Sequence, residues 1–163
     1  MAPKLLGLAC KILICDYEPE VRSRLQTMLE SHALGYRIDH AANGIKAIEH
    51  INNHTPDLVF IDVHMPFLGG FDILDHLKFR PLIVFCSSNE QDALSAFEAR
   101  AFDFLLKPVP SQHLSACLNK LSTHREQFFR LHGYCRSLGL DKLIVKKNRT
   151  NHVVWLTDFM LFR

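Results

Sequence analysis

The chain has 163 residues, of which 48% are hydrophobic and 22% charged, and its formal net charge at pH 7 is +2. This length suits one well-buried domain and a smaller segment, and the composition is that of a globular protein. So small a net charge argues against nucleic-acid binding by the fold as a whole.

Strand-like and helix-like segments alternate in five rounds through the first two thirds of the chain. The strand-like segments are short apolar runs at 11–16, 36–41, 57–62, 82–87 and 102–107. The amphipathic segments between and after them have helical spacing and cover 18–31, 44–52, 71–79, 91–100 and 111–121. Strands that alternate with single helices form a parallel sheet covered on both faces. The sequence therefore predicts a doubly wound α/β fold.

After residue 121 the last helical pattern continues to about residue 131. Gly133 then indicates the start of a linker near 132–140. We therefore expect a domain at 9–121, followed by a helix extension and linker at 122–140.

Two strand-like segments, 142–147 and 152–156, follow this linker and are separated by turn residues. An isolated hairpin is at best marginally stable in water, and the chain ends shortly afterwards at Arg163. We therefore expect 141–163 to be the incomplete start of a second domain.

The cysteines are scattered, odd in number and free of CxxC spacing; they are Cys10, Cys15, Cys86, Cys117 and Cys135. This pattern favours reduced thiols over a disulfide framework or a zinc site. No apolar stretch approaches the ~20 residues of a membrane span, and the N-terminus lacks the long apolar core of a signal peptide. We expect a cytoplasmic protein that has no membrane partner.

Polar side chains stand at the ends of four predicted strands; they are Asp16, Asp62, Ser87 and Lys107. The carboxyl ends of parallel strands meet at one edge of the sheet, where open α/β sheets place their chemistry. A single strand-end aspartate is most simply a cap or turn residue. Four polar groups on four strand ends indicate one shared site.

These groups, in this order, resemble the CheY-like receiver domain of two-component response regulators. The resemblance covers about residues 9–121 and is carried by the segments 14–19, 56–66, 70–74 and 101–108. Together with Ala96-Phe97-Glu98, the last segment is similar to regulators that carry a LytTR-type DNA-binding domain, and the final strand-like segments resemble the start of such a domain. The resemblance implies a flavodoxin-like sheet in the order 2-1-3-4-5, flanked by helices, with a short C-terminal β segment.

The resemblance also implies a role for each strand-end residue. Asp62 is the expected phosphoacceptor, and Lys107 and Ser87 are expected to bind the phosphoryl group. The position of Ser87 is open by one residue because Cys86 also fits, but the separation between Ser87 and Lys107 is the one usual in LytTR-type regulators. Phe104 occupies the position of the aromatic switch. A cis bond is expected between Lys107 and Pro108.

A magnesium ion is the cofactor that the resemblance implies, bound by Asp16, Asp62 and the backbone carbonyl of His64. Tyr17 stands where receivers usually have the carboxylate that touches the metal directly. A phenol with a pKa of ~10 is neutral at pH 7 and is a poor magnesium ligand. We therefore expect weakened magnesium binding, for which Asp16 and Glu18 offer partial compensation.

The implied function is that of a signalling receiver rather than an enzyme, which controls a C-terminal transcription-regulating domain. The expected partners are a histidine kinase or a small-molecule phosphodonor, a second copy of the chain, and DNA only through the rest of the C-terminal domain. The alternative is a degenerate receiver that acts without phosphorylation as a dimerisation or partner-binding module. A phosphatase of the haloacid dehalogenase type is disfavoured because His64 stands where that family needs a second aspartate.

Overall fold

The computed structural model describes residues 10–32, 35–137, 142–147 and 150–155, with side chains as far as His124. The chain forms two compact units, Met1–Leu114 and Ser115–Arg163. In the described part of the chain, no helix is both long and apolar enough to cross a membrane. The cysteines whose side chains are described, Cys10, Cys15, Cys86 and Cys117, are all buried.

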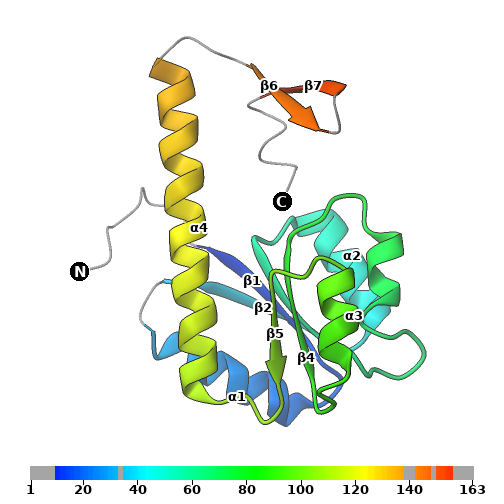
Figure 1. Cartoon of the computed structure of the whole chain (residues 1–163). Coiled ribbons are helices and arrows are strands. Elements are labelled where there is room, and N and C mark those ends of the chain that lie inside the picture. The colour runs from blue at the N-terminus through cyan, green and yellow to red at the C-terminus, as the bar shows by residue number, and fades with distance from the viewer. Residues whose placement is uncertain (1–9, 33–34, 138–141, 148–149, 156–163) are drawn as a thin grey trace. The chain divides into compact units, whose positions relative to one another are not determined.

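The first unit is built on a five-stranded parallel sheet with the strand order β2-β1-β3-β4-β5 (Figure 1). Its strands are β1 (Lys11–Cys15), β2 (Arg37–Ala41), β3 (Leu58–Asp62), β4 (Leu82–Ser87) and β5 (Asp103–Leu106). Every residue of β3 is buried, as expected for a central strand covered on both faces. The predicted doubly wound, flavodoxin-like order is confirmed.

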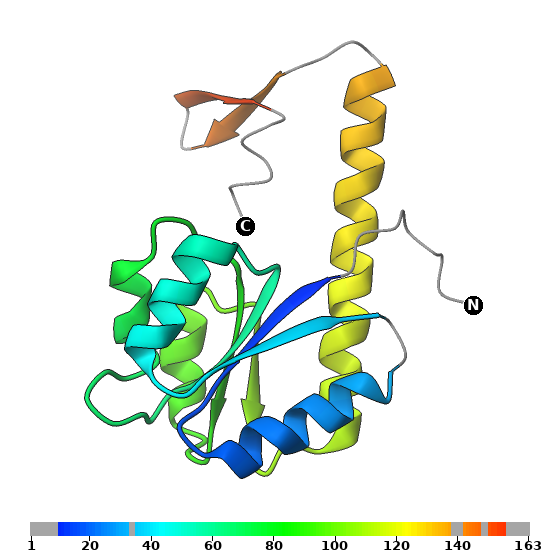
Figure 2. The ribbon, with the colours of Figure 1, turned by 180° about the vertical axis from the view of Figure 1, so that it is seen from behind.

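Helices cover both faces of this sheet (Figures 1 and 2). They are α1 (Pro19–Glu30), α2 (Gly44–His54) and α3 (Asp92–Glu98), with a 3-10 helix, η1 (Asp72–His76), between β3 and β4. α1 buries Leu25 and Leu29, and α2 buries Ala47 and Ile51, so each of these helices presents residues four positions apart to the sheet. The amphipathic spacing in the sequence thus identified the helical faces.

Alternate residues of the strands serve the two faces of the sheet. Leu13, Val59 and Phe85 belong to the core cluster that also contains the buried residues of α2, η1 and α3. Their neighbours Ile14 and Phe60 are on the opposite face, where they line a pocket together with residues of α1. The period of two along each strand therefore divides the core into two layers.

The segment 71–79, which we predicted as a helix, forms only the short 3-10 helix η1. Leu77 already has an extended backbone, with φ −83° and ψ 130°. Pro81 disfavours a helical conformation at Arg80, so the chain must extend before β4 begins. One apolar residue of the predicted amphipathic segment, Ile73, is nevertheless fully buried.

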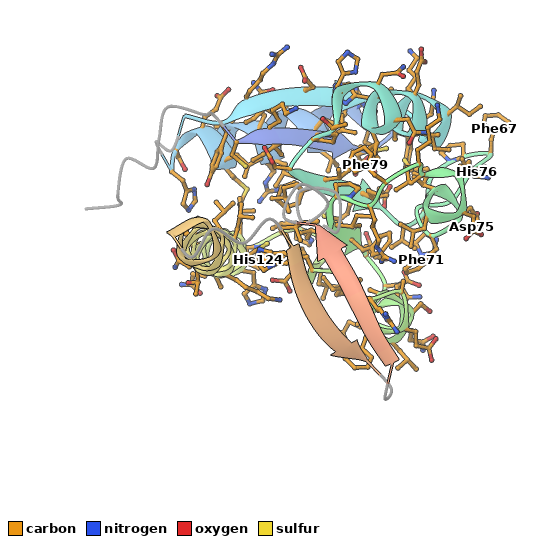
Figure 3. All side chains as sticks on the ribbon, turned by 90° about the horizontal axis from the view of Figure 1, so that it is seen from above. Phe67, Phe71, Asp75, His76, Phe79 and His124 are labelled. Carbon is orange, nitrogen blue, oxygen red and sulfur yellow. The ribbon has the colours of Figure 1, made fainter. Side chains whose placement is uncertain are left out.

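Two phenylalanines, Phe67 and Phe71, lie between β3 and η1 in different surroundings, with Phe67 at the rim of the molecule in Figure 3. The Phe71 ring packs on Phe85 of β4, with ring centroids 4.4 Å apart. Phe67 is fully exposed and has a positive φ of 68°, a rare conformation for a bulky residue. Phe71 therefore attaches the β3–η1 loop to the core, together with the buried Val63 and Met65, whereas Phe67 lies in solvent.

α4 (Ser111–Ser137) begins in the first unit and continues into the second. The helix passes through Gly133, so the linker that we predicted from residue 132 does not begin there. A single glycine costs an α-helix only about 1 kcal/mol, which the flanking helical sequence outweighs. Residues 138–141, the rest of the predicted linker, lie outside the described residues.

The predicted C-terminal strands are present as β6 (Lys142–Lys147) and β7 (Thr150–Trp155). They pair antiparallel, with Lys142 opposite Trp155 and Lys147 opposite Thr150. The predicted turn falls partly on residues 148–149, and the end of the predicted second domain on 156–163, both of which lie outside the described residues. Assignment of 141–163 to a second domain stays a prediction.

Gly70 allows the β3–η1 loop to approach the end of β3. Its N–H donates to the Val63 carbonyl at 2.9 Å, and a Cβ atom at Gly70 would lie 2.5 Å from the Asp62 carbonyl oxygen. At Gly69, the nearest atom to such a Cβ would be Asp72 Oδ2 at 3.1 Å, which belongs to a movable side chain. Of these two neighbouring glycines, Gly70 is the one that backbone packing requires.

We predict that Gly70→Ala lowers the free energy of unfolding by about 1–3 kcal/mol, as is typical of overpacked sites. Gly69→Ala is the matched control and should cost distinctly less. Urea denaturation followed by circular dichroism measures both variants. Equal stability of the two variants would contradict the close approach at Gly70.

Candidate functional site

Two neighbouring strands each deliver a carboxylate to the same edge of the sheet. Asp16 directly follows β1, and Asp62 is the last residue of β3. Both residues are buried, with 3% and 4% of their surface exposed. Asp16 Oδ1 accepts a hydrogen bond from the Glu18 N–H at 2.9 Å, and Asp62 Oδ1 accepts one from the His64 N–H at 3.3 Å. Each carboxylate is thus oriented by the loop that follows its strand.

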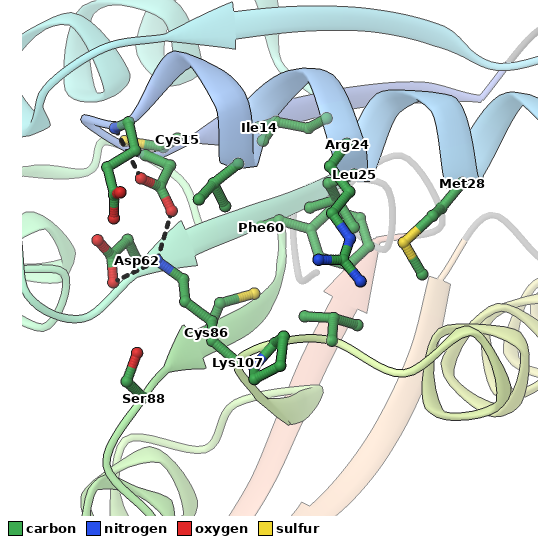
Figure 4. A pocket seen from close by; sticks show the side chains of 15 residues that line it. Ile14, Cys15, Arg24, Leu25, Met28, Phe60, Asp62, Cys86, Ser88 and Lys107 are labelled. Carbon is green, nitrogen blue, oxygen red and sulfur yellow. Dashed lines mark hydrogen bonds and ion pairs between the residues drawn. The ribbon is translucent and has the colours of Figure 1, made fainter.

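Lys107 places its ammonium group between these two carboxylates (Figure 4). Its Nζ lies 2.6 Å from Asp16 Oδ2 and 3.2 Å from Asp62 Oδ1. The backbone of Lys107 follows β5, its N–H donates to the Ser87 carbonyl at 2.7 Å, and the expected cis bond to Pro108 is present. The structure therefore brings Asp16, Asp62 and Lys107 together.

Burial and charge shift the pKa values of this cluster. Burial raises the pKa of Asp62 above its ordinary value of 3.8, the charge of Lys107 lowers it in part, and the charge of Asp16 raises it further. Burial alone would lower the pKa of Lys107, but its hydrogen bond to Asp16 and the charge of Asp62 raise it overall. Lys107 therefore stays charged, and the pKa of the buried Asp62 remains raised.

Ser87 ends β4 at the same edge, but its hydroxyl is not part of this cluster. Ser87 is fully buried, and its Oγ donates a hydrogen bond to Asp92 Oδ2 at 2.5 Å. Asp92 also lies 2.7 Å from Nε2 of His64. We had expected Ser87 to converge with the other three residues, and this expectation overlooked Asp92. In the sequence, Asp92 looks like an ordinary acidic residue in the first turn of a helix, so only the fold reveals its partners.

A pocket of about 230 Å³ opens beside the cluster and extends beneath α1 (Figure 4). Asp16, Asp62 and Lys107 lie among its lining residues, and Leu25 and Phe60 contribute apolar walls. Ser88, rather than Ser87, is the β4-loop serine that lines this pocket.

The site offers magnesium few ligands, namely two carboxylates. Mg²⁺ takes one or two carboxylates and keeps several waters, a pattern that Asp16 and Asp62 can satisfy. Within the described residues, no group of three or more histidine, cysteine and acidic side chains could hold a metal ion. Tyr17 is 46% exposed, and the charge of Glu18 raises the pKa of its phenol, so this side chain stays neutral at pH 7. The residues present fit a magnesium ion that has two carboxylate ligands.

Phe104 lies in β5 opposite Phe85 of β4 and is partly buried against the core cluster. Its ring is thus in contact with the core, and its N–H is bonded to Asp103 Oδ1 at 2.9 Å. The role of an aromatic switch remains a prediction for this residue.

We predict that Asp62→Asn stabilises the protein near neutral pH in magnesium-free buffer. Because the pKa of Asp62 is raised in the folded state, its ionised form opposes folding. The parent chain should therefore lose stability relative to Asp62→Asn as the pH rises from about 3.8 through the raised pKa, and the difference should vanish at lower pH.

Urea denaturation of both proteins across this pH range measures the difference. Asp75→Asn, a change at an exposed carboxylate, serves as the control, and its stability should follow that of the parent chain across the same pH range. A parent chain that gained stability over Asp62→Asn with rising pH would reverse the sign and contradict the argument.

Comparison with known proteins agrees with this geometry. Residues 12–119 match the family model of the response regulator receiver domain. The transcriptional regulatory protein BtsR of Salmonella typhi is 35% identical over 119 residues, which are 72% of this chain and 50% of that protein. The sensory transduction protein LytT of Enterococcus faecalis is 34% identical, over 71% of this chain and 49% of its own length. The chain therefore spans about half the length of these relatives.

Solved structures show the same fold. The response regulatory domain of mrkE from Klebsiella pneumoniae is 26% identical and has a TM-score of 0.63, with 72% of this chain and 98% of that one covered. A CheY-like receiver domain protein from Methanospirillum hungatei JF-1 has a TM-score of 0.65 at 21% identity, over 74% of this chain and 98% of its own, and supports the fold alone. With its parallel sheet and clustered strand-end residues, this chain belongs to the response regulator receiver domain family of two-component signalling.

Proposed function

We propose that this receiver accepts a phosphoryl group on Asp62 and thereby controls a C-terminal transcription-regulating domain. The observation that supports this proposal most strongly is the position of the Lys107 ammonium, 2.6 Å from Asp16 and 3.2 Å from Asp62. A nucleophilic carboxylate beside a fixed cation is the arrangement that phosphoryl transfer requires, because the reaction depends mainly on positioning and charge neutralisation.

In the proposed reaction, an oxygen of the Asp62 carboxylate attacks the phosphorus of the donor. A new oxygen–phosphorus bond forms, and the bond between phosphorus and the leaving group breaks, with its electron pair departing on the leaving group. Lys107 then pairs with a phosphoryl oxygen as a point charge. Ser87 is the proposed hydroxyl donor to the same group, and Phe104 the proposed aromatic switch.

Magnesium is the proposed cofactor. Asp16, Asp62 and the backbone carbonyl of His64 would hold it, and when bound it would neutralise charge on the transferring group. Lys107 already supplies one positive charge to the two carboxylates. Tyr17 supplies none, so we expect magnesium to bind weakly.

The proposed phosphodonor is a histidine kinase or a small phosphorylated molecule, and the proposed assembly is a homodimer. Control of transcription as the output is supported by the named relatives, which are a transcriptional regulatory protein and a sensory transduction protein. The β6–β7 hairpin is compatible with the first strands of a LytTR-type domain, through the remainder of which DNA would be bound.

A degenerate receiver, which acts without phosphorylation as a dimerisation or partner-binding module, is the second candidate function. Tyr17 is the observation that favours it, because a neutral phenol replaces a carboxylate beside Asp16. Both candidate functions use the same fold. They differ in whether a site that has Tyr17 in place of a carboxylate still supports phosphoryl transfer to Asp62. Measurements of phosphoryl transfer therefore separate them.

We predict that a small phosphodonor and Mg²⁺ together add one phosphoryl group to the chain, and that Asp62→Asn abolishes this modification. Intact-protein mass spectrometry detects the product, and peptide mapping locates it. Removing Mg²⁺ with a chelator should slow the modification at least about tenfold, because the cation neutralises the phosphoryl charge. Asp75→Asn is the control and should be modified like the parent chain.

We further predict that Tyr17→Asp strengthens magnesium binding and speeds the modification of Asp62, each by about tenfold or more. The change adds one negative charge and removes a large ring beside the proposed metal position. Calorimetry measures the magnesium affinity, and timed mass spectrometry measures the rate. Tyr17→Phe, which keeps the ring and adds no charge, serves as the control.

If the parent chain binds magnesium as tightly as Tyr17→Asp and reacts as fast, the argument for a weakened metal site is wrong. If neither protein is modified at Asp62 under any of these conditions, the degenerate receiver is the better description.

A further inference from the structure

One carboxylate oxygen joins three elements at the candidate site. Oδ2 of Asp92, the first residue of α3, lies 2.5 Å from Ser87 Oγ and 2.7 Å from His64 Nε2. Ser87 ends β4, and His64 lies in the loop after β3, two residues beyond the proposed phosphoacceptor. Asp92 therefore connects the start of α3 to the strand ends on which Asp62 and Ser87 lie.

The Ser87 hydroxyl makes two hydrogen bonds, which use its single proton and one of its two acceptor sites. Its proton is donated to Asp92, and its oxygen accepts the Asn89 N–H at 3.0 Å. Ser87 is fully buried and the Asp92 side chain is only 16% exposed, so water competes little for this bond. A short hydrogen bond to a carboxylate is among the stronger types in proteins. The proton that a phosphoryl group on Asp62 would accept is therefore already in use.

We propose that Asp92 is a positioning residue that holds Ser87 away from Asp62, so that Ser87 can bind a phosphoryl group only after releasing Asp92. This proposal rests on the proposed function and adds that a carboxylate of the same chain competes with the phosphoryl group for Ser87. The phosphoryl oxygens and the Asp92 carboxylate compete for one hydroxyl proton. Asp92 thereby raises the free energy of the modified arrangement relative to the unmodified one.

His64 also connects Asp92 to Asp62, the proposed phosphoacceptor. Its N–H donates to Asp62 Oδ1 at 3.3 Å, while its ring contacts Asp92. The imidazole is 63% exposed, so solvent can replace this contact readily. The buried bond to Ser87 is therefore the stronger of the two that Asp92 makes.

Beryllofluoride, which occupies the place of a phosphoryl group on a carboxylate, is the probe that tests the proposal. We expect Asp92→Ala to bind it about tenfold more tightly than the parent chain, the scale of one hydrogen bond to a charged group. Glu90→Ala is the matched control, since it removes an exposed carboxylate from the same loop, and should change the affinity less than about twofold. Fluorine NMR titration in the presence of Mg²⁺ measures all three proteins.

A double-variant cycle separates the hydrogen bond from a general effect of charge. In the Ser87→Ala background, Asp92→Ala should no longer increase beryllofluoride affinity. An increase that persists without the Ser87 hydroxyl would overturn the proposal, as would an equal increase in Glu90→Ala. Asp92→Leu has a side chain of similar size that cannot accept a hydrogen bond, and it carries the same test if Asp92→Ala fails to fold.

Proton NMR of the unmodified protein gives a readout that is independent of the probe. The Ser87 hydroxyl should show a slowly exchanging signal in the parent chain and in Glu90→Ala, but not in Asp92→Ala. Loss of beryllofluoride binding in every protein, with this signal intact, would refute the proposed function and this proposal with it. Binding that is equal in the parent chain and Asp92→Ala would overturn this proposal alone and leave the proposed function standing.

Discussion

The ion pairs of Lys107 with Asp16 and Asp62 are the interaction on which the architecture of the site depends. Two carboxylates are buried at one edge of the sheet, and neither would stay ionised there without a neighbouring cation. Lys107 supplies that cation from the end of β5, so its ion pairs connect the ends of β1, β3 and β5. Burial keeps the pKa of Asp62 raised although the charge of Lys107 lowers it in part. Two ionised carboxylates and one ammonium leave the cluster with a net negative charge, which supports the proposal that it binds magnesium.

The loops at this edge are held by short-range contacts with the strand ends and with one another. Gly70 lets the backbone after β3 pack against the Asp62 carbonyl, at a distance that no side chain would allow. On the other side, Asp92 binds Ser87 and His64 and so joins the β4 loop to the β3 loop. Asp62 therefore lies among loops that are connected to one another by these contacts. A group added to Asp62 would have to disturb these contacts to be accommodated.

The sequence by itself determined the fold and most of the site. Apolar runs alternating with amphipathic segments dictated a parallel sheet with helices on both faces, because continuous apolar strands are stable only when both faces are buried. Asp16, Asp62 and Lys107 could be assigned to one edge because parallel strands end on the same side. The segment 71–79 was harder, since helical spacing cannot reveal that the chain is already extended at Leu77. Gly133 misled for a related reason, because glycine alone does not end a helix.

Only the tertiary structure decided how the site residues are oriented. Sequence placed Ser87 at the correct strand end, but which partner its hydroxyl selects depends on where α3 begins in space. Asp92 lies close to Ser87 in the chain, and His64 is brought to the same oxygen from a distant loop. Such a hydrogen bond is set by distances and angles that no residue pattern encodes. Strand ends follow from local periodicity, whereas the choice between competing hydrogen-bond partners follows from packing.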